Sequence, residues 1–176
     1  MSGTSKIHKA KAQGILSYGV IICSTSRYNL MQRGEKVNDL GGETIVELLE
    51  KAGQNVLYKR IIADDQKLIL DAVKEGLDNS NLDVIIFSGG TGITSTDITI
   101  ETVCPLYEKT LPGFGEFFRR ISFERIGSAA VLSRAVAGVA KGKAIFCVPG
   151  SPDAVRVAVE MLILPESPHI VEHARE

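Results

Sequence analysis

The sequence contains no tryptophan, and it has only three histidines and three cysteines among its 176 residues. The histidines, His8, His169 and His173, all lie near the ends of the chain, which disfavours a Ser-His-Asp triad, a Cys-His pair or a histidine-based metal site. The cysteines are odd in number, and their spacing matches neither a zinc site nor a disulfide framework. We therefore expect carboxylates, hydroxyls, backbone amides and arginines to carry any catalytic chemistry.

The chain also lacks a surplus of charge and a long apolar run. Its formal net charge of -1 disfavours a nucleic-acid partner and a membrane-surface role, both of which require many basic residues. No apolar stretch approaches the roughly 20 residues that span a bilayer, and the N-terminal segment contains lysines but no apolar signal region. We expect a flexible, solvated tail over residues 1–17, a single domain over residues 18–176 and a cytoplasmic location.

Apolar runs alternate with amphipathic segments in the first half of the chain. Residues 18–25, 55–63 and 82–88 are typical of buried strands, because they are almost continuously apolar. Residues 43–53 have apolar side chains at helical spacing, and residues 64–78 begin with the acidic residues that the helix dipole favours. This β-α-β-α-β order predicts an α/β protein with a mainly parallel central sheet covered by helices.

The second half of the chain is less regular. Residues 97–110 begin like a helix but contain a proline that should end or kink it. Two apolar runs follow, and we interpret their end as a hairpin whose second strand is residues 143–148. Residues 151–165 are typical of a helix, with Ser151 as its N-cap.

Small polar and acidic residues follow each expected strand. Ligands of parallel α/β sheets bind beyond the carboxyl ends of the strands, so these residues are candidates for one shared site. They are Thr25 after the first strand, Asp64 after the second, Ser88 to Gly92 after the third, and Pro149, Gly150 and Ser151 after the strand at 143–148.

The segment SGGTG at 88–92 is rich in glycine. Gly89, Gly90 and Gly92 would let backbone N–H groups approach an anion closely, and the hydroxyls of the serine and the threonine would add donors. The segment matches neither GxxxxGK[ST] nor GxGxxG. It is equally consistent with a tight strand-to-helix turn in which Asp97 is an ordinary N-cap.

Two aspartates and one arginine are the charged candidates near these strand ends. Asp64 and Asp97 are candidate ligands of Mg²⁺, which accompanies many bound phosphates and takes one or two carboxylates. For Asp64, helix capping is the alternative. Arg134 lies beside Ser133 in an otherwise apolar segment, so we interpret it as a candidate phosphate ligand.

Four stretches in order, SGGTGITSTD, LPGFGEFFR, LSRAVAG and VPGSPDAV, carry a resemblance to a known family. With these motifs the chain resembles the molybdenum cofactor biosynthesis proteins of the MoaB/MogA type, to which the G domain of gephyrin is related. The resemblance extends over residues 15–165. It implies a three-layer α/β/α, molybdopterin-binding-like fold and a homo-oligomer, either a trimer or a hexamer built from two trimers.

The resemblance also implies an activity. The active branch of the family adenylylates molybdopterin: its terminal phosphate attacks the α-phosphate of Mg·ATP, pyrophosphate leaves, and the product passes to a molybdate-inserting enzyme. Molybdopterin and ATP would be the substrates, and Mg²⁺ would be the cofactor. The attacking phosphate is already ionised, so catalysis can rest on positioning and charge neutralisation without a histidine base.

The family motifs imply roles for particular residues. Asp64 and Asp97 would be catalytic and would hold Mg²⁺. Together with Thr25 from the strand-end argument, the substrate-binding residues would be Asp39, Ser88, Gly89, Gly90, Thr91, Gly92, Ser133, Arg134, Gly138, Pro149, Gly150 and Ser151. Two positions depart from the family pattern: Thr96, where arginine is frequent, and Gly41, where serine is usual.

Two other functions stay open. The departures at Thr96 and Gly41 motivate a non-catalytic module that binds and delivers molybdopterin, which predicts pterin affinity without productive ATP binding. Related domains in proteins that act on nucleotides motivate a nucleotide pyrophosphatase, which predicts cleavage of ATP or a dinucleotide without pterin.

Overall fold

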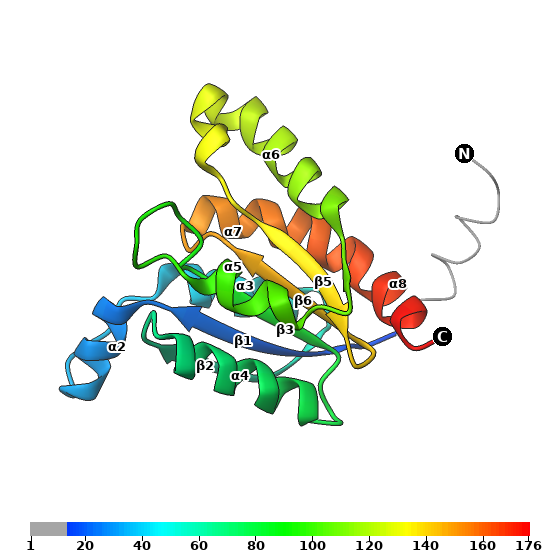
Figure 1. The fold of residues 1–176 in the computed structure, drawn as a ribbon, viewed down its shortest axis with the longest axis horizontal. Helices are drawn as coiled ribbons and strands as arrows, with labels where there is room; N and C mark the ends of the chain where they lie inside the picture. Colours follow the sequence, from blue (N-terminus) through cyan, green and yellow to red (C-terminus); the bar gives the residue numbers. More distant parts are fainter. Residues whose placement is uncertain (1–13) are drawn as a thin grey trace.

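The computed structural model describes residues 14–176, and over this range six strands form one sheet (Figure 1). In order across the sheet, the strands are β2 (Asn55–Ile62), β1 (Ser17–Cys23), β3 (Val84–Ser88), β6 (Lys143–Val148), β5 (Val136–Ala140) and β4 (Lys109–Thr110). The first four run parallel to one another, whereas β5 and β4 are antiparallel to their neighbours. The predicted α/β fold with a mainly parallel sheet is therefore confirmed.

Helices cover both faces of this sheet (Figure 1). One face carries α3 (Leu40–Lys51), α6 (Pro112–Ile126), α7 (Pro152–Ala158) and α8 (Leu164–Ala174), and the other carries α4 (Gln66–Asp78) and α5 (Thr99–Val103). A further helix, α2 (Thr25–Gln32), contacts β2. The described part of the chain thus has the three α/β/α layers that the resemblance implies.

Each central strand is buried on both sides, which explains the continuous apolar runs. In β1, Tyr18, Val20 and Ile22 belong to the core shared with α3 and α7, whereas Ile21 and Cys23 belong to the core shared with α4 and α5. The same alternation occurs in β3 and β6. Because β1, β3 and β6 are parallel and paired in register, their carboxyl ends lie at one edge of the sheet.

The folded domain begins within the first few described residues. Leu16 is buried and β1 begins at Ser17, slightly before the expected domain boundary at residue 18. Residues 1–13 of the expected tail lie outside the described residues. None of the helices between residues 14 and 176 has the length and apolarity needed to cross a membrane.

The hairpin between β5 and β6 confirms the predicted strand at 143–148. Its two turn residues, Lys141 and Gly142, have positive φ angles of 48° and 69°. Two positive φ angles are required by the type I′ turn, whose twist matches that of the flanking strands. The turn therefore fixes the register in which β5 continues the sheet beside β6.

The segment between β1 and α3, for which the sequence predicts no helix or strand, contains α2. Ser24 is its N-cap and accepts a hydrogen bond from the N–H of Arg27. Within residues 97–110 the α-helix is α5, and a 3₁₀ turn, Cys104–Leu106, replaces it at the proline, as the sequence predicts. Pro105 explains the early end, because it has no N–H with which to continue the α-helical ladder.

The last helical segment is longer than predicted. It begins with Ser151 as the N-cap, as expected, and its Oγ accepts a hydrogen bond from the N–H of Ala154. α7 then passes through a π-helical turn, Val159–Ile163, into α8, which ends at Ala174. Neither Pro165, near the start of α8, nor Pro168, inside it, ends the helix. The π-helical turn just before them already interrupts the regular ladder of α-helical hydrogen bonds.

Asp39 lies inside the fold, only 2% exposed, at the start of α3. Its Oδ1 accepts a hydrogen bond from the N–H of Gly42 at 3.1 Å, and its Oδ2 accepts one from Nζ of Lys59 at 3.0 Å. The carboxylate thus caps α3 and ties it to β2. Both carboxylate oxygens thus have protein partners, and the substrate contact that the resemblance implies for Asp39 stays a prediction.

We predict that Asp39→Ala lowers the free energy of unfolding by about 2–3 kcal/mol, because it removes both a helix cap and a charge-assisted hydrogen bond. Asp65→Ala is the matched control: Asp65 caps α4 through the N–H of Leu68 but is exposed. We expect this control to cost about 1 kcal/mol. Urea denaturation measures both losses, and equal losses would contradict the role assigned to the Asp39–Lys59 pair.

Candidate functional site

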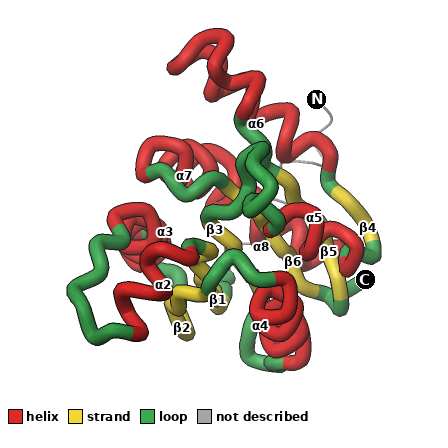
Figure 2. Tube along the Cα trace, turned by 60° about the vertical axis from the view of Figure 1, so that its left-hand side comes forward, coloured by secondary structure: helices red, strands yellow, loops and turns green. Residues whose placement is uncertain are grey.

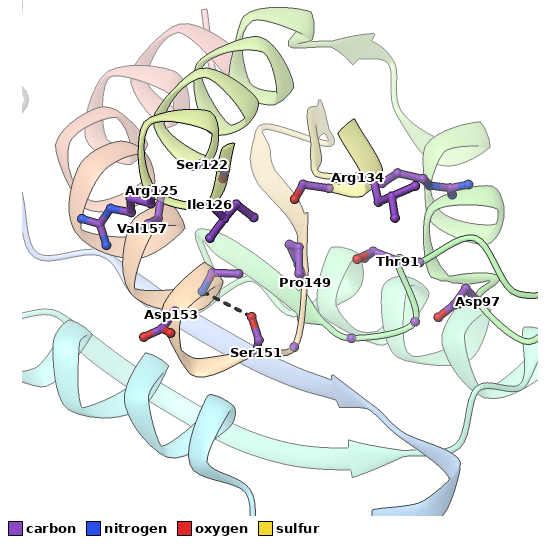
Figure 3. Close-up of a pocket in the computed structure, with 17 residues that line it drawn as sticks. Thr91, Asp97, Ser122, Arg125, Ile126, Arg134, Pro149, Ser151, Asp153 and Val157 are labelled. Carbon is purple, nitrogen blue, oxygen red and sulfur yellow. Dashed lines mark hydrogen bonds between the residues drawn. The ribbon is translucent and has the colours of Figure 1, made fainter. Parts of the chain in front are cut away.

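A cavity of about 680 Å³ lies at the edge of the sheet where the parallel strands end (Figure 3). This volume falls within the range of roughly 300–1,000 Å³ that is typical of small-molecule sites. After β3, the cavity is lined by Gly89, Gly90, Thr91, Gly92 and Asp97. From the second half of the chain, the predicted residues that line it are Ser133, Arg134, Pro149, Gly150 and Ser151. Strand ends that are distant in the sequence therefore meet, as the sequence predicts.

The glycine turn after β3 depends on the absence of side chains. Gly89 and Gly90 have φ angles of 99° and 60°, which side-chain-bearing residues rarely adopt. A Cβ at Gly89 would lie 2.3 Å from the carbonyl oxygen of Cys23, and a Cβ at Gly90 would lie 2.3 Å from Oγ1 of Thr99. The carbonyl oxygen of Gly90 also accepts a hydrogen bond from the N–H of Thr99 at 3.0 Å. The turn is thus held between the end of β1 and the start of α5.

Asp64 lies directly behind this turn, outside the described cavity lining. Its Oδ2 accepts hydrogen bonds from the backbone N–H and the hydroxyl of Thr25, at 2.8 and 2.9 Å. Its Oδ1 would be 2.8 Å from a Cβ at Gly90, so this oxygen faces the glycine turn. Asp65, and not Asp64, is the N-cap of α4. Thr25 and Asp64 therefore join the ends of β1 and β2 beneath the turn.

Asp97 lines the cavity and is held by its own loop. Its Oδ2 accepts hydrogen bonds from the hydroxyl and the N–H of Thr94, at 2.6 and 2.9 Å. The Thr94 hydroxyl, the N–H groups of Thr94 and Gly92 and the charge of Arg134 together hold the pKa of Asp97 below its ordinary value, although partial burial raises it. Ile98 directly precedes α5, so Asp97 is not the N-cap of that helix. Its carboxylate is ionised and faces the cavity.

The loop after β6 packs against the glycine turn at very short range. A Cβ at Gly150 would lie 3.3 Å from Cα of Gly89, and a Cβ at Gly41 would lie 2.5 Å from the carbonyl oxygen of Gly150. Ser88, which is 1% exposed, donates its hydroxyl to the carbonyl oxygen of Pro149 at 3.4 Å. Ser88 therefore links the two loops by a hydrogen bond. It is not among the residues that line the cavity.

A second predicted site residue lies in the sheet, as Ser88 does. Gly138 is in β5, where it pairs with Thr110 of β4. A Cβ at this position would lie 2.3 Å from the ring of Tyr107. The glycine of the SRAVAG motif thus makes room for an aromatic ring, and the structure places it outside the described cavity lining.

Helices supply a wall of the cavity that reasoning from strand ends missed. α6 contributes Ser122, Arg125 and Ile126, which lie on one helical face at spacings of three and four residues. The remaining lining residues are Leu132, Asp153, Ala154 and Val157. This helical spacing is present in the sequence, but nothing in the sequence indicates that the face turns toward the strand ends.

The cavity has two charged ends. Figure 3 shows Thr91, Asp97 and Arg134 toward one end, and Arg125 and Asp153 toward the other. The N–H groups of Gly90 and Thr91 and the guanidinium groups offer donors to an anion, while the carboxylates favour a cation. The N–H of Gly89 donates to the carbonyl oxygen of Val148, and that of Gly92 donates to Asp97. Three or more His, Cys, Asp or Glu residues do not converge on a metal position anywhere in residues 14–176. A divalent cation would therefore have to share ligands with a bound phosphate.

Fold and site together define an α/β protein with a polar cavity at the carboxyl edge of a parallel sheet, the edge where proteins of this class bind their ligands. Residues 19–169 match the family described as probable molybdopterin binding domain. The chain is 39% identical to molybdenum cofactor biosynthesis protein B of Bacillus subtilis (strain 168) over 170 residues, 96% of each chain. It is 43% identical to molybdopterin adenylyltransferase of Pyrococcus furiosus over 173 residues, 96% of this chain and 97% of that one.

Solved structures show the same relationship. A crystal structure of molybdenum cofactor biosynthesis protein B has a TM-score of 0.84 at 40% identity, covering 92% of this chain and 97% of that chain. The tungsten cofactor synthesizing protein MoaB from Pyrococcus furiosus has a TM-score of 0.80 at 40% identity, covering 92% and 98%. The chain therefore belongs to the molybdopterin-binding MoaB/MogA family, as its motifs indicate.

The contact between Gly41 and Gly150 can be tested with a matched pair of glycines. Gly41 and Gly113 are each the second residue of a helix, and among the described residues nothing lies within 4 Å of a Cβ at Gly113. We predict that Gly113→Ala raises the free energy of unfolding by up to about 1 kcal/mol through helix propensity. Gly41→Ala should lower it by about 1–3 kcal/mol, because the carbonyl of Gly150 must move.

Urea denaturation compares the two variants, and amide NMR shifts of Gly150 and Ser151 report on the loop. We expect the shifts to change in Gly41→Ala and to stay as they are in Gly113→Ala. If both alanines stabilise the protein alike and leave the loop unchanged, the close packing of α3 on the 149–151 loop is refuted.

Proposed function

We propose that the protein is a molybdopterin adenylyltransferase of molybdenum cofactor biosynthesis, which joins AMP from Mg·ATP to the terminal phosphate of molybdopterin and releases pyrophosphate. The observation that carries this proposal is the cavity that is lined jointly by the glycine turn, Asp97, Arg134 and the 149–151 loop. Its two charged ends suit a reaction that brings two phosphate-bearing substrates together. The names of relatives that align over nearly the whole chain support the same activity.

The proposed reaction is an in-line displacement at phosphorus. An oxygen of the molybdopterin phosphate forms a bond to the α-phosphorus of ATP, and the bond to the bridging oxygen of the β-phosphate breaks. Pyrophosphate leaves with that electron pair, and no proton has to be removed from the nucleophile. The protein then contributes positioning and charge stabilisation, for which the N–H groups of Gly90 and Thr91 and the guanidinium of Arg134 are candidate donors.

Mg²⁺ would neutralise the charge that develops on the phosphates. Asp97 fits this ion, because its carboxylate is ionised and lines the cavity. Oδ2 of Asp64 accepts hydrogen bonds from Thr25, whereas Oδ1 of Asp64 faces Gly90 at the turn. Mg²⁺ commonly takes one or two carboxylates together with substrate phosphates and water, so Asp97, with Asp64 as the second carboxylate, would hold it with ATP.

We predict that the purified protein releases pyrophosphate from Mg·ATP only when molybdopterin is present. Asp97→Asn should lower the rate by about 10²-fold or more, because it removes a negative charge where Mg²⁺ would lie. Asp65→Asn is the control, since Asp65 caps α4 and is not among the residues that line the cavity. Phosphate or pyrophosphate release without pterin would indicate a pyrophosphatase, and molybdopterin affinity without release would indicate a delivery module.

We also propose that the protein forms a homo-oligomer, either a trimer or a dimer of trimers. α6 and the following 3₁₀ turn, Gly127–Leu132, extend away from the sheet (Figure 2). Large apolar side chains are more than half exposed there: Phe117, Phe123, Ile126, Val131 and Leu132. Several large exposed apolar side chains on one projecting segment are typical of a subunit interface.

The assembly is expected to have a mass of three or six times the 19.0 kDa chain in sedimentation velocity. The double variant Phe117→Glu, Phe123→Glu should shift it toward the monomer, because charges would be buried at the interface. Met31→Glu on α2, an exposed apolar residue away from α6, is the control. A monomer in the unmodified protein would contradict the proposal.

Two further expectations follow from the proposed activity. The adenylylated product would pass to a molybdate-inserting enzyme, because its activated phosphate is made for a later exchange. The protein would work in the cytoplasm, where ATP is available. Its three cysteines are free, and free thiols are typical of a reducing compartment.

A further inference from the structure

Arg134 differs from the other charged residues of the cavity. Arg125, Arg134, Asp97 and Asp153 are the charged side chains among the described lining residues, and of these four only Arg134 has an ion-pair partner. That partner is Glu101, whose Oε1 accepts a hydrogen bond from Nη2 of Arg134. The proposed chemistry assigns no role to Glu101, which lies outside the described cavity lining.

The backbone of Glu101 is held in place by the elements around it. It lies in the first turn of α5, where its neighbours Thr99, Thr102 and Val103 are buried. The N–H of Thr99 donates to the carbonyl oxygen of Gly90, which joins the start of this helix to the glycine turn. The position of the Glu101 backbone is therefore set by the same unit that forms the floor of the cavity.

Arg134 lies in a segment without regular secondary structure. It lies between a 3₁₀ turn and β5, 33 residues from Glu101 in the sequence. Its side chain is 33% exposed, so solvent leaves it room to adopt other conformations. The ion pair thus connects a loop to the rigid unit around the glycine turn, and it decides where the guanidinium group lies.

The paired guanidinium still has donors for a ligand. Arginine carries five N–H donors, and the bond to Glu101 uses Nη2. The charge of Arg134 contributes to the lowered pKa of Asp97, which places the guanidinium near that carboxylate at the same end of the cavity. Burial raises the pKa of Glu101, but the hydrogen bond and charge of Arg134 outweigh this effect, so the pair is ionised.

We propose that Glu101 is a positioning residue that holds Arg134 at the edge of the cavity, so that its remaining N–H groups meet a phosphate of the bound nucleotide. The proposal rests on the proposed function in one respect, the identity of the anion. Holding the guanidinium before the ligand arrives reduces the conformational entropy that binding would otherwise remove. Glu101 acts through Arg134 and does not itself touch the ligand.

Charge and position can be separated with two variants. Glu101→Asp keeps the negative charge but is one methylene shorter, so it withdraws from the guanidinium. Glu101→Gln loses the charge but keeps an oxygen at the same distance. If Glu101 acts by position, the aspartate is the more harmful change; if it acts only as a negative charge near an anion, the aspartate is neutral and the glutamine tightens binding.

The test is calorimetry of the full chain with Mg²⁺ and α,β-methylene-ATP. We expect Glu101→Asp to weaken binding about two- to fivefold, the range of a partly exposed ion pair, and Glu101→Gln to weaken it less. Glu47→Asp is the matched control, since Glu47 is paired with Lys51 on α3 and is similarly exposed, 57% against 53% for Glu101. In an Arg134→Ala background, Glu101→Asp should have no further effect.

A second measurement needs no ligand. ¹⁵N relaxation of the Arg134 Nε–H group should show an ordered side chain in the unmodified protein and in Glu47→Asp, and a mobile one in Glu101→Asp. An equally ordered Arg134 in Glu101→Asp would overturn the proposal, as would a loss of affinity that persists without Arg134. If the unmodified protein binds no nucleotide, the proposed function fails, while the relaxation result still decides the role of Glu101.

Discussion

The site depends on how closely three backbone segments approach one another without side chains between them. Gly89 of the turn after β3, Gly150 of the loop after β6 and Gly41 of α3 pack so tightly that a Cβ at Gly41 would meet the Gly150 carbonyl at 2.5 Å. Because protein interiors have little free volume, such a contact prevents the three segments from shifting relative to one another. The two loops that form the cavity floor are thereby fixed relative to each other and to the sheet.

The polar groups around this contact divide into two sets. The first set forms its hydrogen bonds within the protein. Asp39 caps α3, Ser88 links the loop after β3 to the loop after β6, and Thr25 joins the end of β1 to that of β2. Asp97 and Arg134 are also held by protein groups, yet they face the cavity. Such a division favours catalysis, because charged groups that are already oriented need no reorganisation when charge develops on a phosphate.

Much of this arrangement follows from the sequence. The strands were predictable because burial on both faces leaves continuous apolar runs, and the rule for strand ends then selected the glycine turn and the 149–151 loop. The α6 wall was not predictable, because the direction in which Ser122, Arg125 and Ile126 point is set by tertiary packing. Motif membership also could not distinguish Gly138, which makes room for Tyr107, from glycines that line the cavity.

The central claim is that the glycine turn and the 149–151 loop hold the phosphates of ATP. A crystal structure of the protein with Mg²⁺ and α,β-methylene-ATP tests it most directly. The account predicts that the α-phosphate lies between the N–H groups of Gly90 and Thr91 and the 149–151 loop, with Mg²⁺ on Asp97 and the guanidinium of Arg134 on a phosphate oxygen. A nucleotide bound elsewhere, with the glycine turn free of phosphate, would contradict it.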